Sequence, residues 1–357
     1  MKITDLRVYL TRPEGSNRSW VFVELDTDEG ITGVGEATNS GGGGALIVGR
    51  TYEMLKSDLE GQDFSEGLVG LDPANIDAIW HRIYRRFGTL GSRGFGTTLA
   101  SGIDMALWDI KGKFHDVPVY RLVGGPFREK QRVYWSHLAT YRVRSAEILG
   151  KPKLRTMEDV ANCAREAVDA GYTAFKTNIV FPGENPSMIG NMFAGSNDQN
   201  APTDLVRHTV EQIGAMRQAV GPDIDICLDI NYNFKTEGAI NIGRALEPFD
   251  LFWMEIDNQD PESLAQLKSA QRTPICTGEQ LLGLRQYQPY FRRHAMDTVK
   301  VDVQWQGFSQ AKKVAELAEV YELNIAPHNY NSPLSSFQSL NLTAAVSNVR
   351  IMESDVD

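Results

Sequence analysis

The chain has 357 residues, which is enough for an α/β barrel of about 250 residues and a second, smaller domain. Hydrophobic residues make up 42% and charged residues 23% of the chain, a balance that is ordinary for a globular enzyme and excludes a disordered chain. A formal net charge of −10 argues against nucleic acid or an anionic membrane as the main partner, because both attract a basic surface.

The N-terminus and the cysteines bear on the cellular compartment. Residues 1–10 alternate like a strand and lack the apolar stretch of a signal peptide, and no other run approaches the length of a membrane span. Cys163, Cys227 and Cys276 lack the close spacing of a zinc site or a disulfide scaffold, so we expect them to be reduced and buried. These features predict a cytoplasmic protein.

The first part of the chain, residues 1–127, is predicted to be an α+β domain. Residues 2–10 and 19–37 read as an antiparallel meander of strands. Helical periodicity follows in three segments, at residues 45–59, 76–87 and 97–114. The Gly124-Gly125-Pro126 sequence is the best candidate for a junction with the next domain.

Residues 128–357 are predicted to form a second domain, in which strands and helices alternate as in βαβ units of a parallel sheet. Eight strands are predicted, at residues 132–138, 172–180, 223–231, 251–257, 274–280, 297–302, 323–328 and 349–354. Helices are predicted at residues 157–170, 204–220, 237–246, 261–270, 309–321 and 336–345. Eight strands is the number in a TIM barrel. The long polar stretch at residues 181–203 is predicted to be either a lid or disordered.

Three of the predicted strands end in an acid: Asp229, Glu255 and Glu279. In an α/β barrel the C-terminal ends of all strands share one face, so these carboxylates converge although they lie far apart in sequence. Such acids also serve as helix N-caps or loop ion pairs. Three such acids in consecutive βα units favour a bound cation, because nearby carboxylates without one raise one another's pKa. Carboxylate oxygens suit a hard divalent cation, and we expect Mg²⁺.

The remaining strand ends carry further polar residues, listed in chain order as Lys176, Asn178, Asn231, Asp302, His328 and Glu353. The motifs around them are AFKTN, LDIN, WMEID, TGEQ, VKVDVQ, APHN and IMES, preceded by ASGIDMALWDIKGK and RLVGG. In their order and spacing these motifs resemble the enolase superfamily, in particular its mandelate racemase / muconate lactonizing enzyme group. The similarity covers nearly the whole chain.

The resemblance implies a modified TIM barrel, (β/α)7β, beneath an N-terminal α+β capping domain. It also implies Mg²⁺ on Asp229, Glu255 and Glu279, where the metal holds a substrate carboxylate and stabilises the enediolate formed when a base removes the α-proton. By the same resemblance we expect a homo-oligomer, from a dimer to an octamer, that acts on a small carboxylate.

His328 is the base that we predict. A lone histidine after a strand is more often structural, but Asp302 on the neighbouring strand would orient the imidazole and raise its basicity. His137, at the end of the first strand, is a further candidate for lining the pocket.

The second strand departs from the pattern of racemases in this group. They have two lysines one residue apart, whereas this chain has Lys176 and Asn178, and an amide cannot act as the second base. A one-base site can pass the α-proton to a departing β-hydroxyl, which is a syn dehydration. Lys176 would then neutralise the substrate carboxylate, Glu353 would hydrogen-bond it, and Asn178 and Asn231 would hold hydroxyls.

The sequence therefore predicts a Mg²⁺-dependent dehydratase of a sugar acid, an aldonate or aldarate, that forms a 2-keto-3-deoxy acid. The alternatives are a racemase or epimerase of the same fold and a catalytically silent metal-binding scaffold. Members of the group usually continue past the eighth strand and return to the capping domain, whereas this sequence stops at Asp357. We expect either a missing tail or a different closure of the cap.

Overall fold

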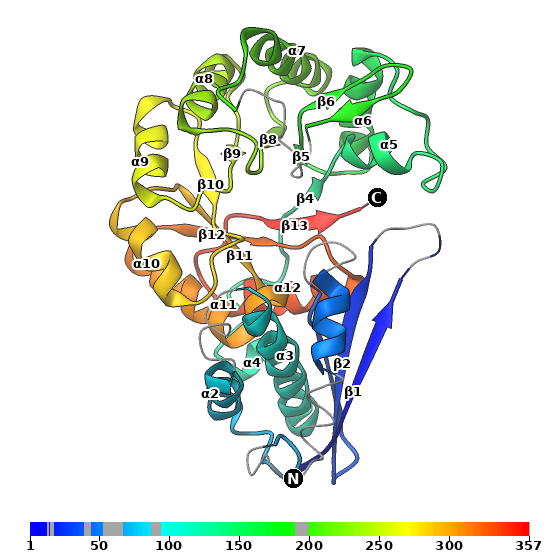
Figure 1. Ribbon diagram of the computed structural model, residues 1–357, viewed down its shortest axis with the longest axis vertical. Helices are drawn as coiled ribbons and strands as arrows, with labels where there is room; N and C mark the ends of the chain where they lie inside the picture. Colours follow the sequence, from blue (N-terminus) through cyan, green and yellow to red (C-terminus); the bar gives the residue numbers. More distant parts are fainter. Residues whose placement is uncertain are drawn as a thin grey trace.

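The computed structural model of the chain describes residues 1–12, 14, 18–38, 44–52, 67–86, 94–189 and 199–356. Figure 1 shows an N-terminal domain of strands and helices at one end of the molecule and a barrel of parallel strands at the other. The last strand of the chain lies beside the first strand of the barrel. The division of the chain near residue 127 remains a prediction.

The N-terminal sheet is the predicted antiparallel meander, in the order β1 (Ile3–Thr11), β2 (Trp20–Thr27) and β3 (Thr32–Glu36). Alternate residues of β2, among them Val23 and Leu25, are fully buried, as expected for a strand with one face on a core. That core lies between the sheet and the helices of this domain.

Helix α3 (Phe95–His115) packs directly on the sheet because glycines line the contact. A Cβ on Gly35 would lie 1.9 Å from the carbonyl oxygen of Gly102, and a Cβ on Gly33 would lie 2.1 Å from that of Ala106. No side chain fits at either position, so the bare backbone sets the distance between helix and sheet.

The predicted helix at residues 76–87 is confirmed as α2 (Ile76–Arg86). The short helix α4 (Val119–Leu122) was not predicted. Residues 44–52 are helical, and the rest of the helix predicted at 45–59 lies outside the described residues.

Eight parallel strands form the barrel: β4 (Val133–Ser136), β5 (Ala174–Thr177), β8 (Asp225–Asp229), β9 (Trp253–Glu255), β10 (Ile275–Thr277), β11 (Thr298–Asp302), β12 (Asn324–His328) and β13 (Met352–Asp355). The sheet runs from β12 through β8 to β13, and its two edges meet where Ile325 bridges Val349. Since the amide of Arg350 also donates to the carbonyl of Ile325 at 2.9 Å, the barrel is nearly closed.

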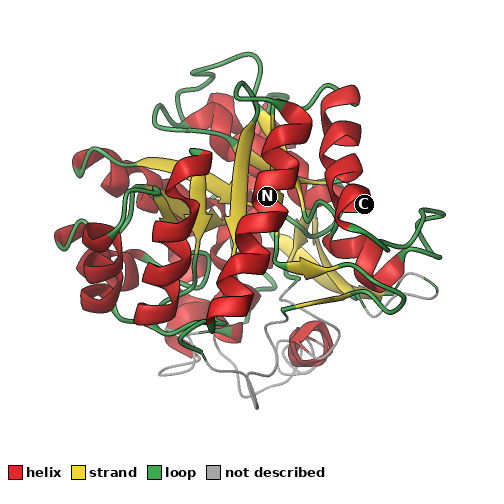
Figure 2. Cartoon of the chain, turned by 90° about the horizontal axis from the view of Figure 1, so that it is seen from above, coloured by secondary structure: helices red, strands yellow, loops and turns green. Residues whose placement is uncertain are grey.

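Seven helices in the described chain lead from one barrel strand to the next: α6 (Met157–Asp169), α7 (Thr203–Val220), α8 (Thr236–Leu246), α9 (Pro261–Ala270), α10 (Leu284–Arg292), α11 (Val303–Val320) and α12 (Pro333–Ala345). Figure 2 shows these helices around the strands. A short helix α5 (Thr140–Ser145) and a 3-10 turn, η2 (Glu247–Phe249), complete the connections. The predicted (β/α)7β barrel with an N-terminal α+β domain is confirmed.

Besides the short helix α5 and the turn η2, which were not predicted, three connections differ from the sequence-based prediction. Helix α10 was not predicted, and it contains Pro289, which weakens a helical pattern. The polar stretch that begins at residue 181 starts as a hairpin of β6 (Val180–Phe181) and β7 (Ser187–Met188), and residues 190–198 lie outside the described residues. Helix α11 begins six residues earlier than predicted, with a non-helical Gly307 inside it.

Side chains fill the interior of the barrel. A cluster of Tyr134, Trp253, Ile351 and smaller residues, including Cys227 and Cys276, lies among the strands. All three cysteines are free and buried, as predicted. None of the helices in the described part of the chain combines the length and the hydrophobicity needed to cross a bilayer.

A buried acid joins the N-terminal domain to the barrel. Asp104 of α3 accepts hydrogen bonds from the amide and the hydroxyl of Ser309 on α11, at 3.0 and 2.5 Å, and Trp108 Nε1 donates to the same hydroxyl at 2.8 Å. Gly307 has a φ of 84°, and a Cβ there would lie 2.8 Å from Asp104 Oδ2. The break in α11 therefore makes room for Asp104.

Burial raises the pKa of Asp104 from 3.8 to about 6. Between about pH 4 and pH 6 the folded state holds a proton that the unfolded state has released. The contribution of Asp104 to stability therefore falls as pH rises through this window, by up to about 3 kcal/mol, and is constant above it.

We predict that Asp104→Asn removes this pH dependence, because the amide does not ionise and its oxygen can still accept from Ser309. The free energy of unfolding is measured in urea from pH 4 to pH 7. As pH rises, the value for the variant should increase relative to the value for the wild type. Glu158→Gln, at an exposed acid paired with Arg165, is the control. A difference between Asp104→Asn and the wild type that stays constant with pH would contradict the prediction.

Candidate active site

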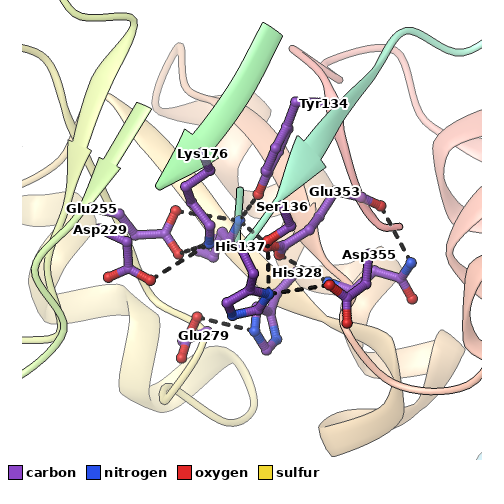
Figure 3. Close-up of polar contacts among 12 residues, drawn as sticks. Tyr134, Ser136, His137, Lys176, Asp229, Glu255, Glu279, His328, Glu353 and Asp355 are labelled. Atoms are coloured by element: carbon purple, nitrogen blue, oxygen red, sulfur yellow. Dashed lines mark hydrogen bonds and ion pairs between the residues drawn. The ribbon is translucent and has the colours of Figure 1, made fainter. Parts of the chain in front are cut away.

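The predicted site residues lie at the C-terminal ends of the barrel strands. Strand β8 ends at Asp229, β9 at Glu255, β11 at Asp302 and β12 at His328, and Glu279 follows β10 by two residues. The parallel register places Asp229 beside Glu255 and Asp302 beside His328. Figure 3 shows Asp229, Glu255 and Glu279 together with Lys176 and His328.

Lys176, on β5, is buried among the carboxylates. Its Nζ lies 2.8 Å from Glu255 Oε1, 2.9 Å from Glu353 Oε1 and 3.7 Å from Asp229 Oδ2. Burial alone would lower the pKa of Lys176, but Glu255 and Glu353 outweigh burial and raise this pKa well above its ordinary value. Lys176 is therefore a fixed positive charge.

A second buried lysine, Lys300 on β11, contacts the same two glutamates. Its Nζ lies 3.0 Å from Glu353 Oε2 and 3.4 Å from Glu255 Oε2, and it hydrogen-bonds the hydroxyl of Tyr134. We call Lys176, Lys300, Glu255 and Glu353 the charge quartet. Sequence reasoning did not include Lys300, although its position two residues before Asp302 puts it on the same face of the strand.

Glu353, on β13, is fully buried. Its carboxylate also accepts hydrogen bonds from the hydroxyl of Ser136 and from the amide of Asn329, the latter at 3.0 Å. Although burial opposes ionisation, Lys176 and Lys300 hold the pKa of Glu353 well below its ordinary value. Its predicted contact with a substrate remains a prediction.

His328 and Asp302 form the predicted pair. Asp302 Oδ2 lies 2.5 Å from His328 Nδ1, and Asp302 Oδ1 accepts from the amide of Trp305 at 2.7 Å. The other ring nitrogen, Nε2, lies 3.3 Å from Glu279 Oε2. Burial would lower the pKa of His328, but Glu279 and Asp302 outweigh burial and raise it to about 9.

Three further acids, Asp229, Asp257 and Glu279, lie near one another, and they are not each paired with a lysine. Burial and then the charges of Glu255 and Glu279 raise the pKa of Asp229 to about 6, although Lys176 acts in the opposite direction. Burial, followed by Glu279 and Asp229, raises the pKa of Asp257 well above its ordinary value. Asp257 was not predicted, although it follows Glu255 by two residues. Lys176 therefore offsets only part of the negative charge around Asp229 and Asp257.

The donor set fits a hard divalent cation, because the predicted ligands are all carboxylates. Throughout the described part of the chain, no three Asp, Glu, His or Cys side chains close on one point as a ready ligand shell. Glu255 turns instead toward the two lysines of the charge quartet, and Glu279 turns toward His328. Asp229, Glu255 and Glu279 remain predicted ligands.

Asn178 and Asn231 brace the loop after β8. Asn178 Nδ2 donates to the carbonyl of Asp229 at 3.0 Å and to Asn231 Oδ1 at 3.3 Å, and its oxygen accepts from Thr140 at 2.9 Å. The amide of Asn231, which has a φ of 48°, donates to Asp229 Oδ1 at 2.9 Å. The two asparagines thus fix Asp229, and their predicted contacts with hydroxyls remain predictions.

His137 lies at the edge of the same space. Its ring centroid is 5.8 Å from that of Tyr330, which is 4.9 Å from that of His328. His137 Nδ1 lies 3.2 Å from Asp355 Oδ1, and Arg18 of the N-terminal domain donates to Asp355 Oδ2 at 2.9 Å. The N-terminal domain therefore contributes to the mouth of the barrel.

The sequence matches two family descriptions that together span most of the chain. Residues 159–357 match "Enolase C-terminal domain-like", and residues 8–124 match "Mandelate racemase / muconate lactonizing enzyme, N-terminal domain".

Several relatives are sugar-acid dehydratases by name. A D-xylonate dehydratase of Haloferax volcanii is 30% identical over 99% of this chain and 78% of its own length. A D-mannonate dehydratase of Caulobacter sp. is 28% identical over 99% of this chain and 84% of its own length.

A solved structure from Burkholderia xenovorans, described as a candidate L-alanine-DL-glutamate epimerase bound to magnesium and fumarate, has a TM-score of 0.89 and 32% identity. The match covers all of this chain and 86% of the solved one.

Proposed function

Since the chain belongs to the mandelate racemase / muconate lactonizing enzyme group of the enolase superfamily, we propose that it is a Mg²⁺-dependent hydro-lyase that dehydrates a sugar acid. The substrate is an aldonate or aldarate and the product is a 2-keto-3-deoxy acid. The observation that carries the proposal is the His328–Asp302 pair at the ends of the neighbouring strands β12 and β11, while β5 continues into Asn178 instead of a second base. The names of the dehydratase relatives support the same class of substrate.

His328 is the proposed acid and base. Because Nδ1–H donates a hydrogen bond to Asp302, the Nε2 atom is the one that can exchange a proton with a substrate. Nε2 removes the proton next to the substrate carboxylate, and the electron pair left behind expels the hydroxyl from the following carbon. Nε2 gives that proton to the departing hydroxyl, which leaves as water. The enol then converts to the 2-keto acid by taking up a proton at C3 and releasing the proton of its C2 hydroxyl.

Asp229, Glu255 and Glu279 are the proposed ligands of Mg²⁺. When bound, the cation would supply positive charge against the charge that develops on the substrate carboxylate, and it would neutralise Glu279, whose charge contributes to the high pKa of His328. The ammonium of Lys176 lies among these acids and is the proposed second positive charge for the substrate carboxylate.

The epimerase alternative requires a second base on the other face of the substrate. Asn178 cannot supply it, because both ends of its amide are engaged by Thr140, Asp229 and Asn231 and an amide does not take up a proton near neutral pH. The silent-scaffold alternative is disfavoured by the close contact between His328 and Asp302, which a protein without proton transfer does not need.

We predict that His328→Asn abolishes dehydration and also the exchange of the substrate α-proton with solvent. The loss of kcat should be about 10²- to 10⁴-fold or more, because one residue serves as both base and acid. The assay screens aldonates and aldarates with Mg²⁺ and scores 2-keto-3-deoxy acids. His294→Asn is the matched control, since His294 is exposed on the surface and its positive φ suits asparagine. A His328→Asn variant with wild-type turnover would refute the assignment of the base.

We predict that Glu255→Gln lowers the affinity for Mg²⁺ by about 10- to 100-fold or more and removes most activity, because the amide is a weaker ligand. Isothermal titration calorimetry with Mg²⁺ measures the affinity without any substrate. Glu262→Gln, which removes an exposed partner of Arg293, is the control and should bind Mg²⁺ as the wild type does. Full turnover in excess chelator would rule out a metal-dependent reaction.

A further inference from the structure

Lys300 is a buried charge in the barrel to which the proposed function gives no role. Its side chain is fully buried, and its Nζ lies 5.0 Å from the ring centroid of Tyr134 and 5.7 Å from that of Trp253. Both aromatic residues belong to the cluster that fills the barrel interior. Lys300 therefore does not contact a substrate at the mouth of the barrel.

The charge quartet alternates in sign. Each glutamate offers its Oε1 atom to Lys176, at 2.8 and 2.9 Å, and its Oε2 atom to Lys300, at 3.4 and 3.0 Å. Two positive and two negative charges sum to zero in a region where an unpaired charge is costly.

Lys176 has a second task that Lys300 does not have. Under the proposed function, on which this inference rests, Lys176 also meets the carboxylate of the substrate. Without Lys300, Lys176 would be the one ammonium of the charge quartet in contact with Glu255 and Glu353 while it also meets that carboxylate. The attraction of the two buried glutamates would then keep the ammonium group of Lys176 close to them and weaken its interaction with the substrate carboxylate.

We propose that Lys300 is a positioning residue: it is the permanent counter-ion of Glu255 and Glu353, and it leaves the charge of Lys176 available to the substrate carboxylate. The affinity for a carboxylate ligand then depends on the net charge of the charge quartet. A purely structural ion pair would affect only the stability of the barrel.

Four proteins separate these two roles. The charge quartet has a net charge of zero in the wild type, −1 in Lys300→Met, +1 in Glu353→Gln and zero again in the double variant, by the count of two lysines and two glutamates. The probe is fumarate, titrated by calorimetry into each protein saturated with Mg²⁺. Fumarate is unreactive in a dehydration, so its binding does not depend on turnover.

We expect Lys300→Met to bind fumarate about 5- to 150-fold more weakly than the wild type, the usual range for coupling between groups that do not touch. The double variant should recover most of that loss, and Glu353→Gln should bind at least as tightly as the wild type. Lys268→Met, which removes a partly exposed ion pair with Asp297, is the control for loss of a lysine and should leave fumarate binding unchanged.

Thermal melting of all five proteins separates stability from binding. If Lys300→Met does not fold, the comparison moves to the Glu353→Gln background, where loss of Lys300 should still weaken fumarate binding. Affinities that follow the melting temperature instead of the net charge would overturn the proposal, as would unchanged binding in Lys300→Met or no fumarate binding by the wild type. If the expected order is found but no sugar acid is dehydrated, the proposed function fails while the role of Lys300 stands.

Discussion

The site depends on the burial of two lysines between two glutamates at the ends of the barrel strands. Burying four charges is tolerable only because each carboxylate meets both ammonium groups and takes further hydrogen bonds, as Glu353 does from Asn329. The parallel register holds these side chains in place, since neighbouring strands end at the same level. With these charges balanced, Asp229, Asp257 and Glu279 are left with an excess of negative charge, which is the physical basis for placing a cation there.

The N-terminal domain is part of this arrangement. Glu36, at the end of β3, is fully buried and accepts hydrogen bonds from the amide and hydroxyl of Ser332, at 3.3 and 2.5 Å. Ser332 caps α12 and closes the short loop that begins at His328. Arg18 donates to the carbonyl of Tyr330 in the same loop at 3.1 Å. The segment that carries the proposed base is therefore held by both domains.

Much of this was predictable from the sequence, and the exceptions have physical reasons. Acids after short apolar strands predicted Asp229, Glu255 and Glu279 at one face, and the structure brings them to the same mouth together with Asp302 and His328. The sequence analysis did not identify Lys300, because a lysine in a strand is usually expected to be exposed. Only its partners on other strands explain its burial. The break at Gly307 depends on packing against Asp104, which no local pattern reveals.

The one-base site is the central claim, and it is tested most directly by following the configuration at C2 of a sugar acid during the reaction. The wild-type protein is incubated with Mg²⁺ and substrate in deuterated water, and both product and recovered substrate are analysed by NMR. The account predicts a 2-keto-3-deoxy acid and recovered substrate of unchanged configuration, because His328 is the base on one face and Asn178 cannot act on the other. Interconversion of C2 stereoisomers without any keto product would contradict the account.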